Sequence, residues 1–350
     1  MNKQISIPLG TIIFILACNA PSAVSAPTSD LLATLAASTP VSGNPANPSL
    51  ATPTSAFGFA TPASTLFVPS SSLTNPPTGK IVFTCQVYKV QASNQICIIN
   101  ADGTGFRRLT TDNTRQHYYP SLSPDGQSVV YAAFREENIY EIYEMSLAAG
   151  EVKQLTNRLG VVNAPEISPN GKFIVFMRWT VNSNRYTIML MDRNGGNADN
   201  ISGITGWDPT WSPDGKYILF ASDMNGSVQL YTMRDNGKEL RRISNLSAIR
   251  GRSDWSIDGQ NIVTYSGESW KREVYIMNAD GTNARVLSPA GGNSQGPAFS
   301  PDAKWVAFTA YFDHFGDDHG CEIYIMRIDG SDLRRLTEND YCDYQPRWGT

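Results

Sequence analysis

The stretch WSPDGKYILF, Trp211–Phe220, recurs in four other versions along the chain. These are LSPDGQSVVY from Leu122, ISPNGKFIVF from Ile167, WSIDGQNIVT from Trp255 and FSPDAKWVAF from Phe299. Their serines, at positions 123, 168, 212, 256 and 300, are 45, 44, 44 and 44 residues apart. A catalytic motif is needed once per site, so a motif that returns at a constant interval indicates a structural repeat.

A second motif alternates with the first and occurs six times. Its copies are ICIINADGT from Ile96, IYEMSLAAG from Ile142, IMLMDRNGG from Ile188, LYTMRDNGK from Leu230, VYIMNADGT from Val274 and IYIMRIDGS from Ile323. Several copies are followed by a short run that ends in Thr or Ser, such as Arg107–Thr110 and Arg334–Thr337. The chain therefore contains six related units.

Each unit has the local signals of four short strands. In Ser-Pro-Asp-Gly, Pro suits the second position of a turn, Asp bonds to nearby backbone and Gly tolerates positive φ. This turn joins a strand that ends at Trp211 to the apolar strand Tyr217–Ala221. The Asp-Gly or Asn-Gly after the second motif is a further hairpin signal. The paired arginines mark an outer edge strand, where exposed charge discourages pairing with another chain.

The two ends of the repeat region complement each other. The first unit begins at Thr78–Phe83 without an innermost strand, and the last residues, Gln345–Thr350, resemble the missing strand. Six units of about 44 residues, each with four strands, are typical of a β-propeller. We therefore predict an all-β fold over residues 78–350: a six-bladed β-propeller of four-stranded antiparallel blades, closed by pairing of the two ends.

The alternating motifs also resemble the propeller repeats of the TolB family, periplasmic proteins of the Tol–Pal envelope system. The resemblance extends from Gly79 to Thr350 and implies the propeller fold. Repeats of this type also occur in prolyl-oligopeptidase-like peptidases and in oligogalacturonate lyase, so the resemblance does not imply one function. TolB proteins carry an α/β domain ahead of the propeller, whereas this chain has a low-complexity segment there.

The first residues are typical of an export signal. Residues 1–18 contain one Lys, the apolar run Ile5–Ala17 and then Cys18. Ile15–Cys18 resembles the lipobox of bacterial lipoproteins, which implies a lipid on Cys18 and a place at the cell envelope. Two alternatives stay open: a soluble secreted protein cut after Ala26, and a retained anchor. Residues 19–77 are rich in Ala, Ser, Thr and Pro and almost uncharged, which predicts a disordered tether.

Composition excludes some classes of function. Charged residues make up 17% of the chain and the net charge is −4, so bulk electrostatics do not favour nucleic acid or an anionic membrane surface. The sequence has no Gly-x-Ser-x-Gly, Cys-x-x-Cys or His-Glu-x-x-His motif. The recurring aspartates are interpreted as turn residues rather than catalytic acids: Asp125, Asp214, Asp258 and Asp302.

The cysteines suggest two disulfides. Cys85 ends a second strand and Cys97 begins the neighbouring third strand, while Cys321 begins the last unit's third strand and Cys342 lies in its exit loop. An oxidising export route permits the pairs Cys85–Cys97 and Cys321–Cys342, which leaves Cys18 for the lipid. The alternative is that these four thiols are free and buried.

One loop departs from the repeat, because the last unit is five residues longer and contains YFDHFGDDHGC, Tyr311–Cys321. Oxygen and imidazole ligands together are able to hold Ca²⁺, Mn²⁺ or Zn²⁺. The candidate ligands are Asp313, His314, Asp317, Asp318 and His319, with Asp340, Asp343 and His117 expected nearby. The alternative is a solvated loop held by its disulfide, with no cofactor.

The same face collects aromatic and arginine side chains in its loops. Exposed aromatic residues provide a large contact area at low entropic cost, as is common in binding surfaces. The candidates are Tyr118, Trp179, Trp207, Arg250, Arg252, Trp270, Phe312, Tyr341 and Tyr344. Several of these aromatics are equally well explained as wedges between blades, and Trp211, Trp255 and Trp348 are expected to be such wedges.

We therefore expect an envelope-anchored, non-enzymatic binding module. It would dock a protein, peptide or glycan on one propeller face, and meet the membrane through its N-terminal lipid only. The main alternative is a metal-dependent lyase or hydrolase with its site around His314 and His319. A purely structural envelope protein is a third hypothesis.

Overall fold

The computed structural model describes residues 76–88, 93–180, 184–313, 316–317 and 320–350. The chain divides into two units, Met1–Asn75 and Pro76–Thr350, and the described residues all belong to the second. The expected signal sequence, Cys18 and nearly all of the expected tether 19–77 therefore lie outside the described residues. Within the described part, every regular element is a β-strand.

The strands follow the repeat and form six consecutive groups of four, here called units 1 to 6. Unit 1 comprises β24 (Asp343–Gly349), β1 (Lys80–Gln86), β2 (Asn94–Asn100) and β3 (Arg107–Arg108); unit 2 comprises β4 (His117–Leu122), β5 (Ser128–Glu136), β6 (Ile139–Ser146) and β7 (Val152–Gln154). Unit 3 comprises β8 (Val161–Ile167), β9 (Phe173–Thr180), β10 (Arg185–Asp192) and β11 (Asp199–Thr205); unit 4 comprises β12 (Trp207–Trp211), β13 (Tyr217–Ser222), β14 (Gln229–Arg234) and β15 (Arg241–Arg242). Unit 5 comprises β16 (Asp254–Trp255), β17 (Asn261–Ser266), β18 (Glu273–Asn278) and β19 (Arg285–Val286); unit 6 comprises β20 (Gln295–Phe299), β21 (Trp305–Ala310), β22 (Glu322–Arg327) and β23 (Arg334–Arg335).

The sheets differ in number from the prediction of six separate four-stranded blades. Four sheets have four strands each, whereas units 2 and 3 form a single eight-stranded sheet. The join is one parallel bridge between Tyr140 of β6 and Val161 of β8, next to a hydrogen bond from the Tyr140 N–H to the Gly160 carbonyl at 3.1 Å. The prediction of six separate sheets is wrong here because β8 begins close enough to β6 to pair with it.

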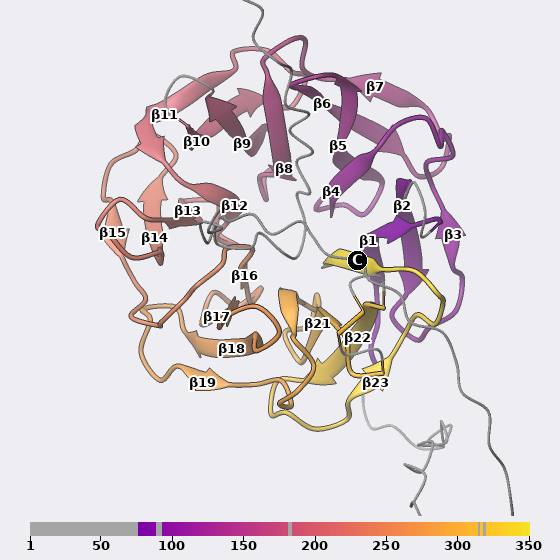
Figure 1. The fold of residues 1–350 in the computed structure, drawn as a ribbon. Helices are drawn as coiled ribbons and strands as arrows, with labels where there is room; N and C mark the ends of the chain where they lie inside the picture. Colours follow the sequence, from indigo (N-terminus) through magenta and orange to yellow (C-terminus); the bar gives the residue numbers. More distant parts are fainter. Residues whose placement is uncertain (1–75, 89–92, 181–183, 314–315, 318–319) are drawn as a thin grey trace, which may run out of the picture. The chain divides into compact units, whose positions relative to one another are not determined.

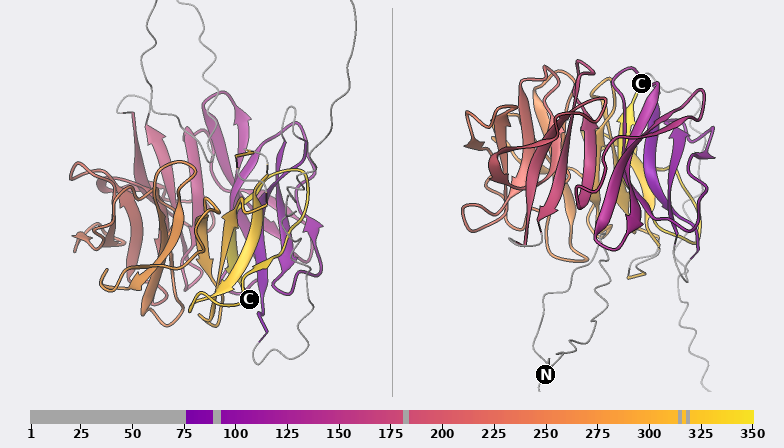
Figure 2. Two further views of the ribbon diagram at one scale, coloured as in Figure 1. Left: turned by 60° about the horizontal axis from the view of Figure 1, so that its bottom comes forward. Right: turned by 90° about the horizontal axis from the view of Figure 1, so that it is seen from above.

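The units are arranged around a central axis, as Figure 1 shows. Strands β4, β8, β12 and β16 lie nearest the centre, and β3, β7, β11, β15, β19 and β23 lie at the outer rim. The strands run roughly along the axis (Figure 2). The "loop face" carries the connections between units and those between second and third strands; the "turn face" carries both repeated turns. All-β architecture with antiparallel four-stranded units is thus confirmed.

The Ser-Pro-Asp-Gly turns are stabilised by hydrogen bonds from side chains to the backbone and to one another within the hairpin. The Ser212 hydroxyl donates to Oδ1 of Asp214 at 2.7 Å and accepts the N–H of Tyr217 at 2.9 Å. The same serine-to-aspartate bond, or serine-to-asparagine in one case, occurs at 123/125, 168/170, 256/258 and 300/302. The serine hydrogen bond is the main cause of the lowered pKa of Asp125 and Asp258. These aspartates are turn residues, as predicted.

The Thr or Ser that ends each outer run holds that run against the third strand. Thr110 accepts the N–H of Ile96 through its hydroxyl oxygen at 2.8 Å. The same bond joins Thr156 to Ile142, Ser244 to Leu230, Ser288 to Val274 and Thr337 to Ile323. Unit 3 differs, because the Ser202 hydroxyl donates instead to the Asn236 carbonyl of unit 4 at 3.3 Å.

Apolar side chains fill the spaces between neighbouring units. Phe220 of unit 4, for example, packs with Val175 and Ile188 of unit 3 in one buried cluster. Trp211 belongs to the same cluster, Trp348 is buried between units 1 and 6, and Trp255 packs at the edge of the cluster between units 4 and 5. The three tryptophans therefore act as the predicted wedges between units.

The two ends of the described unit pair in one sheet, as the sequence predicts. β24 is antiparallel to β1, with Lys80 opposite Gly349 and Cys85 opposite Asp343. The Trp348 indole N–H also donates to the Thr78 carbonyl at 2.8 Å. The last strand therefore completes the first unit and closes the ring.

Candidate functional site

The innermost strands share a kink that shapes the central channel. A residue with left-handed φ precedes Pro in five of the six: Tyr119 (54°), Ala164 (51°), Asp208 (51°), Gly296 (57°) and Gln345 (58°). The strand register shifts at each of these positions, so each is a β-bulge. Unit 5 has Arg252-Ser253 at the equivalent position, and its innermost strand is reduced to Asp254–Trp255.

Charged residues next to these bulges connect units across the channel. Arg347 of β24 lies 3.4 Å from a Glu166 carboxylate oxygen of unit 3 and 3.5 Å from an Asp254 carboxylate oxygen of unit 5. It also donates to the Ser253 carbonyl at 3.1 Å. Glu166 in turn accepts the Thr210 hydroxyl of unit 4 at 2.7 Å. The closing strand is thus tied to three other units.

Arg252 crosses to the opposite side of the ring. Its guanidinium donates to the Pro120 carbonyl of unit 2 at 3.3 Å and to the Gln345 carbonyl at 3.2 Å. It also lies over the Tyr119 ring, 5.3 Å from the ring centroid. The backbone N–H of Arg252 donates to a carboxylate oxygen of Asp208 in unit 4 at 3.0 Å. Unit 5 and unit 2 lie opposite each other in Figure 1, so this one side chain spans the channel.

Burial sets the electrostatics of this group. It raises the pKa of Asp254 to about 6, lowers the pKa of Arg252 to about 10 and raises that of Asp208. Arg252 and Arg347 lie with the carboxylates of Glu166 and Asp208 around a gap that is too small to admit a water molecule. Asp254 lies beside Arg347 at its edge. The channel is therefore closed at this level by a charged network, which joins units rather than holding a substrate.

The repeat pattern of the sequence does not reveal this network. Arg252 is expected on the exposed rim from its position in the sequence, whereas it is only 5% exposed and lies in the channel. A signal was present: the residue after the X-Pro pair is Glu166 in unit 3 and Arg347 in unit 1, and Asp254 occupies the equivalent position in unit 5. The other three units have the uncharged residues Ser121, Thr210 and Ala298 there. Charges at an innermost position need partners, and the ring provides them across the channel.

Two of the expected binding residues are buried, which corrects the prediction that they are exposed. Tyr118 is 9% exposed and Tyr344 is 5% exposed. The Tyr344 hydroxyl donates to the side-chain oxygen of Asn94 at 2.8 Å, and the Asn94 amide donates to the Tyr118 hydroxyl at 3.1 Å. These tyrosines join units 1 and 2 because their hydroxyl groups find a partner below the surface.

The other aromatic candidates are half-buried and each lies beside a neighbour. Trp179 lies against Tyr186, Trp270 against Tyr311 and Phe312 against Tyr324, with ring centroids 4.8, 5.0 and 5.2 Å apart. The Trp207 indole donates to the Arg250 carbonyl at 3.0 Å, the Arg250 guanidinium pairs with Glu268 at 2.8 Å, and Tyr341 is half-buried. These residues pack within the loop face and still present part of their surface.

The predicted metal loop is described only in part. His314, Asp318 and His319 lie outside the described residues. Asp313 accepts the Tyr324 hydroxyl and an Arg335 N–H, both at 2.7 Å. His117 is buried, lies 3.3 Å from the Asn94 carbonyl through Nδ1, and burial lowers its pKa. The described residues contain no group of three or more His, Cys, Asp or Glu that could hold a metal.

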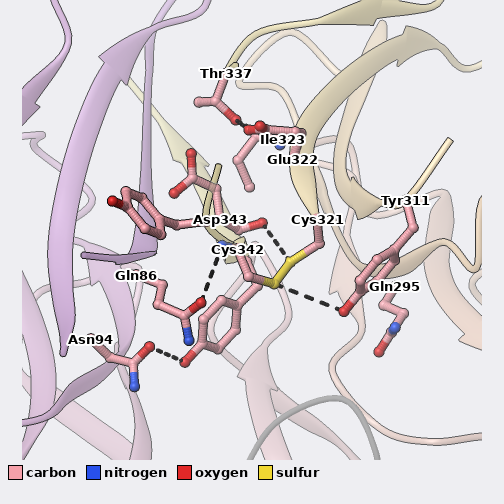
Figure 3. Close-up of a disulfide and its surroundings, with 12 residues drawn as sticks. Gln86, Asn94, Gln295, Tyr311, Cys321, Glu322, Ile323, Thr337, Cys342 and Asp343 are labelled. Atoms are coloured by element: carbon pink, nitrogen blue, oxygen red, sulfur yellow. Dashed lines mark hydrogen bonds between the residues drawn. A yellow bond between two sulfur atoms is a disulfide. The ribbon is translucent and has the colours of Figure 1, made fainter. Parts of the chain in front are cut away.

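Two disulfides flank the ring closure, Cys85–Cys97 and Cys321–Cys342, the pairs that the sequence analysis predicts. The first joins β1 to β2, and the second joins the start of β22 to the entry of β24. Around the second, the Asp343 N–H donates to the Cys321 carbonyl at 2.7 Å and the Gln86 N–H to the Cys342 carbonyl at 3.0 Å. Figure 3 shows this disulfide beside Gln86 and Asp343.

A buried pair of carboxyl groups lies beside this disulfide (Figure 3). Glu322 accepts the Thr337 hydroxyl and the Asn339 N–H, and the Asn339 side chain donates to Asp343 at 2.9 Å. Burial raises the pKa of Glu322 to about 7 and that of Asp343 well above its usual value. Loss of hydration on burial therefore favours the protonated form of these carboxyl groups, while the hydrogen bonds from Thr337 and Asn339 act in the opposite direction.

These features define a β-propeller with a closed channel and one face built from irregular loops. The chain matches the family PD40, TolB beta propeller domain, over residues 77–316, and it belongs to this family. Among the described residues, no helix is long and apolar enough to cross a membrane.

Three relatives illustrate the range of similarity. The uncharacterized protein Atu1656 of Agrobacterium fabrum is 30% identical over 59% of this chain and 59% of its own length. The Tol-Pal system protein TolB of Francisella tularensis is 28% identical over 54% of this chain and 44% of its own. The crystal structure of TolB from Acinetobacter baumannii has a TM-score of 0.69 and 22% identity, and the match covers 79% of this chain and 67% of that chain. This chain covers 32% to 59% of the curated relatives that it matches.

Proposed function

We propose that this protein is a non-enzymatic binding module that docks a partner protein on the loop face of its propeller. The observation that carries the proposal is the contrast between the two faces. The turn face repeats one serine-based turn in five units, with aspartate as the partner in four and asparagine in one. The loop face instead presents half-buried Trp179, Trp207 and Trp270, which lie in or next to loops that differ from unit to unit. Varied loops on a rigid scaffold are the usual place for recognition.

The closed channel supports binding rather than catalysis. Arg252 and Arg347 lie at the centre of the ring, where Arg252 donates to two backbone carbonyls and Arg347 contacts two carboxylates and one carbonyl of the protein itself. A partner would therefore meet a stiff surface around the channel mouth. A stiff surface loses little conformational entropy on binding, so each aromatic contact contributes more to affinity.

The envelope setting is part of the proposal. A lipid on Cys18 and the tether of residues 19–77 would hold the propeller away from a membrane, in the periplasm or at the cell surface. The two disulfides are consistent with export. One relative is named as a Tol-Pal system protein, and a comparable envelope partner is the first to test.

The test is capture of a partner from solubilised envelope material with the full chain as bait. A triple variant, Trp179→Leu, Trp270→Leu and Tyr341→Leu, would lose the partner because these side chains form the accessible aromatic surface. The matched control is Phe106→Leu with Tyr217→Leu, which changes aromatics near the rim and on the turn face. Equal capture by all three proteins would refute docking on the loop face.

The competing proposal is a divalent-metal lyase or hydrolase at the Tyr311–Cys321 loop. Metal content of the purified full chain separates the two proposals. One bound metal per chain that is lost in His314→Ala and His319→Ala, together with an activity lost on chelation, would favour the enzyme. Chains without stoichiometric metal that still capture a partner would favour the binding module.

A further inference from the structure

A groove on the outer side of the ring separates unit 3 from unit 4. One wall is the outer strand β11 and the other is the β14–β15 turn that contains Asp235. Phe173, Leu190 and Ile201 lie in its floor, and its volume is about 340 Å³. It lies apart from the loop face, because the β14–β15 turn belongs to the turn face.

The groove exists because unit 3 breaks the repeat. At two other junctions, the turn between third and fourth strands closely approaches the outer run of the preceding unit: Gly195 approaches Leu155, and Gly281 approaches Ile243. At the corresponding place Gly237 meets the Ser202 side chain instead. The Ser202 hydroxyl donates to the Asn236 carbonyl, whereas the equivalent Thr or Ser of the other units accepts an N–H of the third strand.

The outer strand of unit 3 is displaced as a result. Ser202 and Gly203 have left-handed φ of 53° and 67°, and the pairing with β10 skips from Asn200 to Thr205. β11 nevertheless has seven residues, whereas the other outer strands have two or three. It therefore offers the longest outer edge among the described strands for an extended segment to lie along.

The groove carries unbalanced negative charge. Asp192, Asp199 and Asp235 line it, and in the described part of the chain none of the three belongs to an ion pair. Asp192 accepts only the Asn197 side-chain amide at 2.6 Å, and Asp199 accepts the Asn200 N–H at 2.7 Å. The neighbouring Arg193 pairs with Glu144 and Arg234 pairs with Glu239, and Arg234 also interacts electrostatically with Asp235.

We propose that this groove binds an extended, lysine- or arginine-containing segment of a partner protein. The apolar floor suits the aliphatic part of a Lys or Arg side chain or an adjacent Leu, while the three aspartates suit its charged end. Charge complementarity commits the site to a basic segment: an acidic one would be repelled. The site is independent of the loop face, so the protein has two binding surfaces.

Two synthetic peptides test the proposal on the full chain. A fluorescently labelled Leu-Lys-Leu-Lys-Leu amide should bind in a titration followed by anisotropy, and Leu-Glu-Leu-Glu-Leu amide should not. Binding of the basic peptide should weaken as salt is raised, because the aspartates are solvent-accessible. No binding of the basic peptide at about 2 mM, a level at which even weak contacts register, would overturn the proposal.

Substitutions then locate the site. Asp199→Asn with Asp235→Asn should weaken binding of the basic peptide about tenfold, since two facing charges are lost. The matched control is Glu137→Gln with Glu151→Gln, which removes the same charge from exposed positions elsewhere and should leave binding unchanged. Leu190→Ala should weaken binding without altering its salt dependence. Equal loss in both charge variants, or no loss in either, would show non-specific attraction and refute the site.

Discussion

Arg347, three residues from the end of the chain, contacts Glu166 of unit 3 at 3.4 Å across the central channel. The same guanidinium lies 3.5 Å from Asp254 of unit 5. The last strand is therefore held in two ways: along its edge by pairing with β1, and through its side chain by distant units. Closure of the ring therefore depends on the ion pairs of Arg347 in the channel as well as on the pairing of β24 with β1.

Replacing Arg347 should destabilise the propeller strongly. Arg347→Met keeps most of the side-chain volume but leaves Glu166 and Asp254 without their cation, which should lower the free energy of unfolding by about 3 kcal/mol. Urea unfolding followed by tryptophan fluorescence measures the change. Arg241→Met, at an exposed outer position, is the control and should cost less than about 0.5 kcal/mol. Similar losses in both variants would contradict the role of the channel network.

The Glu322 carboxyl should make stability depend on pH. Burial raises its pKa from 4.5 to about 7, so the folded protein binds more protons than the unfolded chain between these values. Stability from this group is present below pH 4.5 and is lost as pH rises through 7, a loss of about 3 kcal/mol.

The variant Glu322→Gln should therefore flatten the fall in stability between pH 5 and pH 8. Midpoints of urea unfolding at several pH values provide the measurement. Glu151→Gln, at an exposed site, should leave the profile of the parent protein unchanged. Identical pH profiles for Glu322→Gln and the parent would contradict a raised pKa of Glu322.

The Cys321–Cys342 disulfide should contribute to closure. It spans 21 residues and joins unit 6 to the closing strand, so Cys321→Ser with Cys342→Ser should lower stability by about 3 kcal/mol. The same comparison for Cys85→Ser with Cys97→Ser, which spans 12 residues, should give a slightly smaller loss. Thiol titration of the denatured parent checks the pairing: four reactive thiols from these cysteines would rule out both disulfides.

One substitution in a turn is predicted to increase the stability of the propeller. Ile257 occupies the place that Pro124, Pro169, Pro213 and Pro301 hold in the other serine–aspartate turns, and it is 61% exposed. Ile257→Pro should raise the free energy of unfolding by about 0.5–1 kcal/mol, because it restricts the unfolded chain at a position where Pro already fits. The converse change, Pro213→Ile, should lower it by a similar amount. A destabilised Ile257→Pro would mean that this turn differs from the others.

The repeat made the turns, the all-β class and the closing pair of ends predictable. These features depend on contacts between residues close in the chain, or on one motif missing at one end and present at the other. The cysteine pairing could also be predicted from the sequence, because Cys85 and Cys97 lie on adjacent strands of one unit. The sheet connection between units 2 and 3 could not be predicted, since it depends on one bridge between Tyr140 and Val161.

The interior of the channel could not be predicted in the same way. Arg252 was placed on the rim because it lies in a loop of the sequence, yet its partners Pro120 and Gln345 are 132 and 93 residues away. Tyr344 was expected on the surface, but its hydroxyl donates a hydrogen bond to Asn94, which is 250 residues away in the sequence. Which side chains are buried depended on how the bulged strands converge at the axis.

The units, their turns and the strand that closes the ring follow from the sequence alone, because short-range hydrogen bonds and apolar alternation act within a few residues. The tertiary structure alone decided which charges meet in the channel, which aromatics stay accessible, and where the groove beside β11 opens. These depend on distances between units, which arise only when the whole ring has formed.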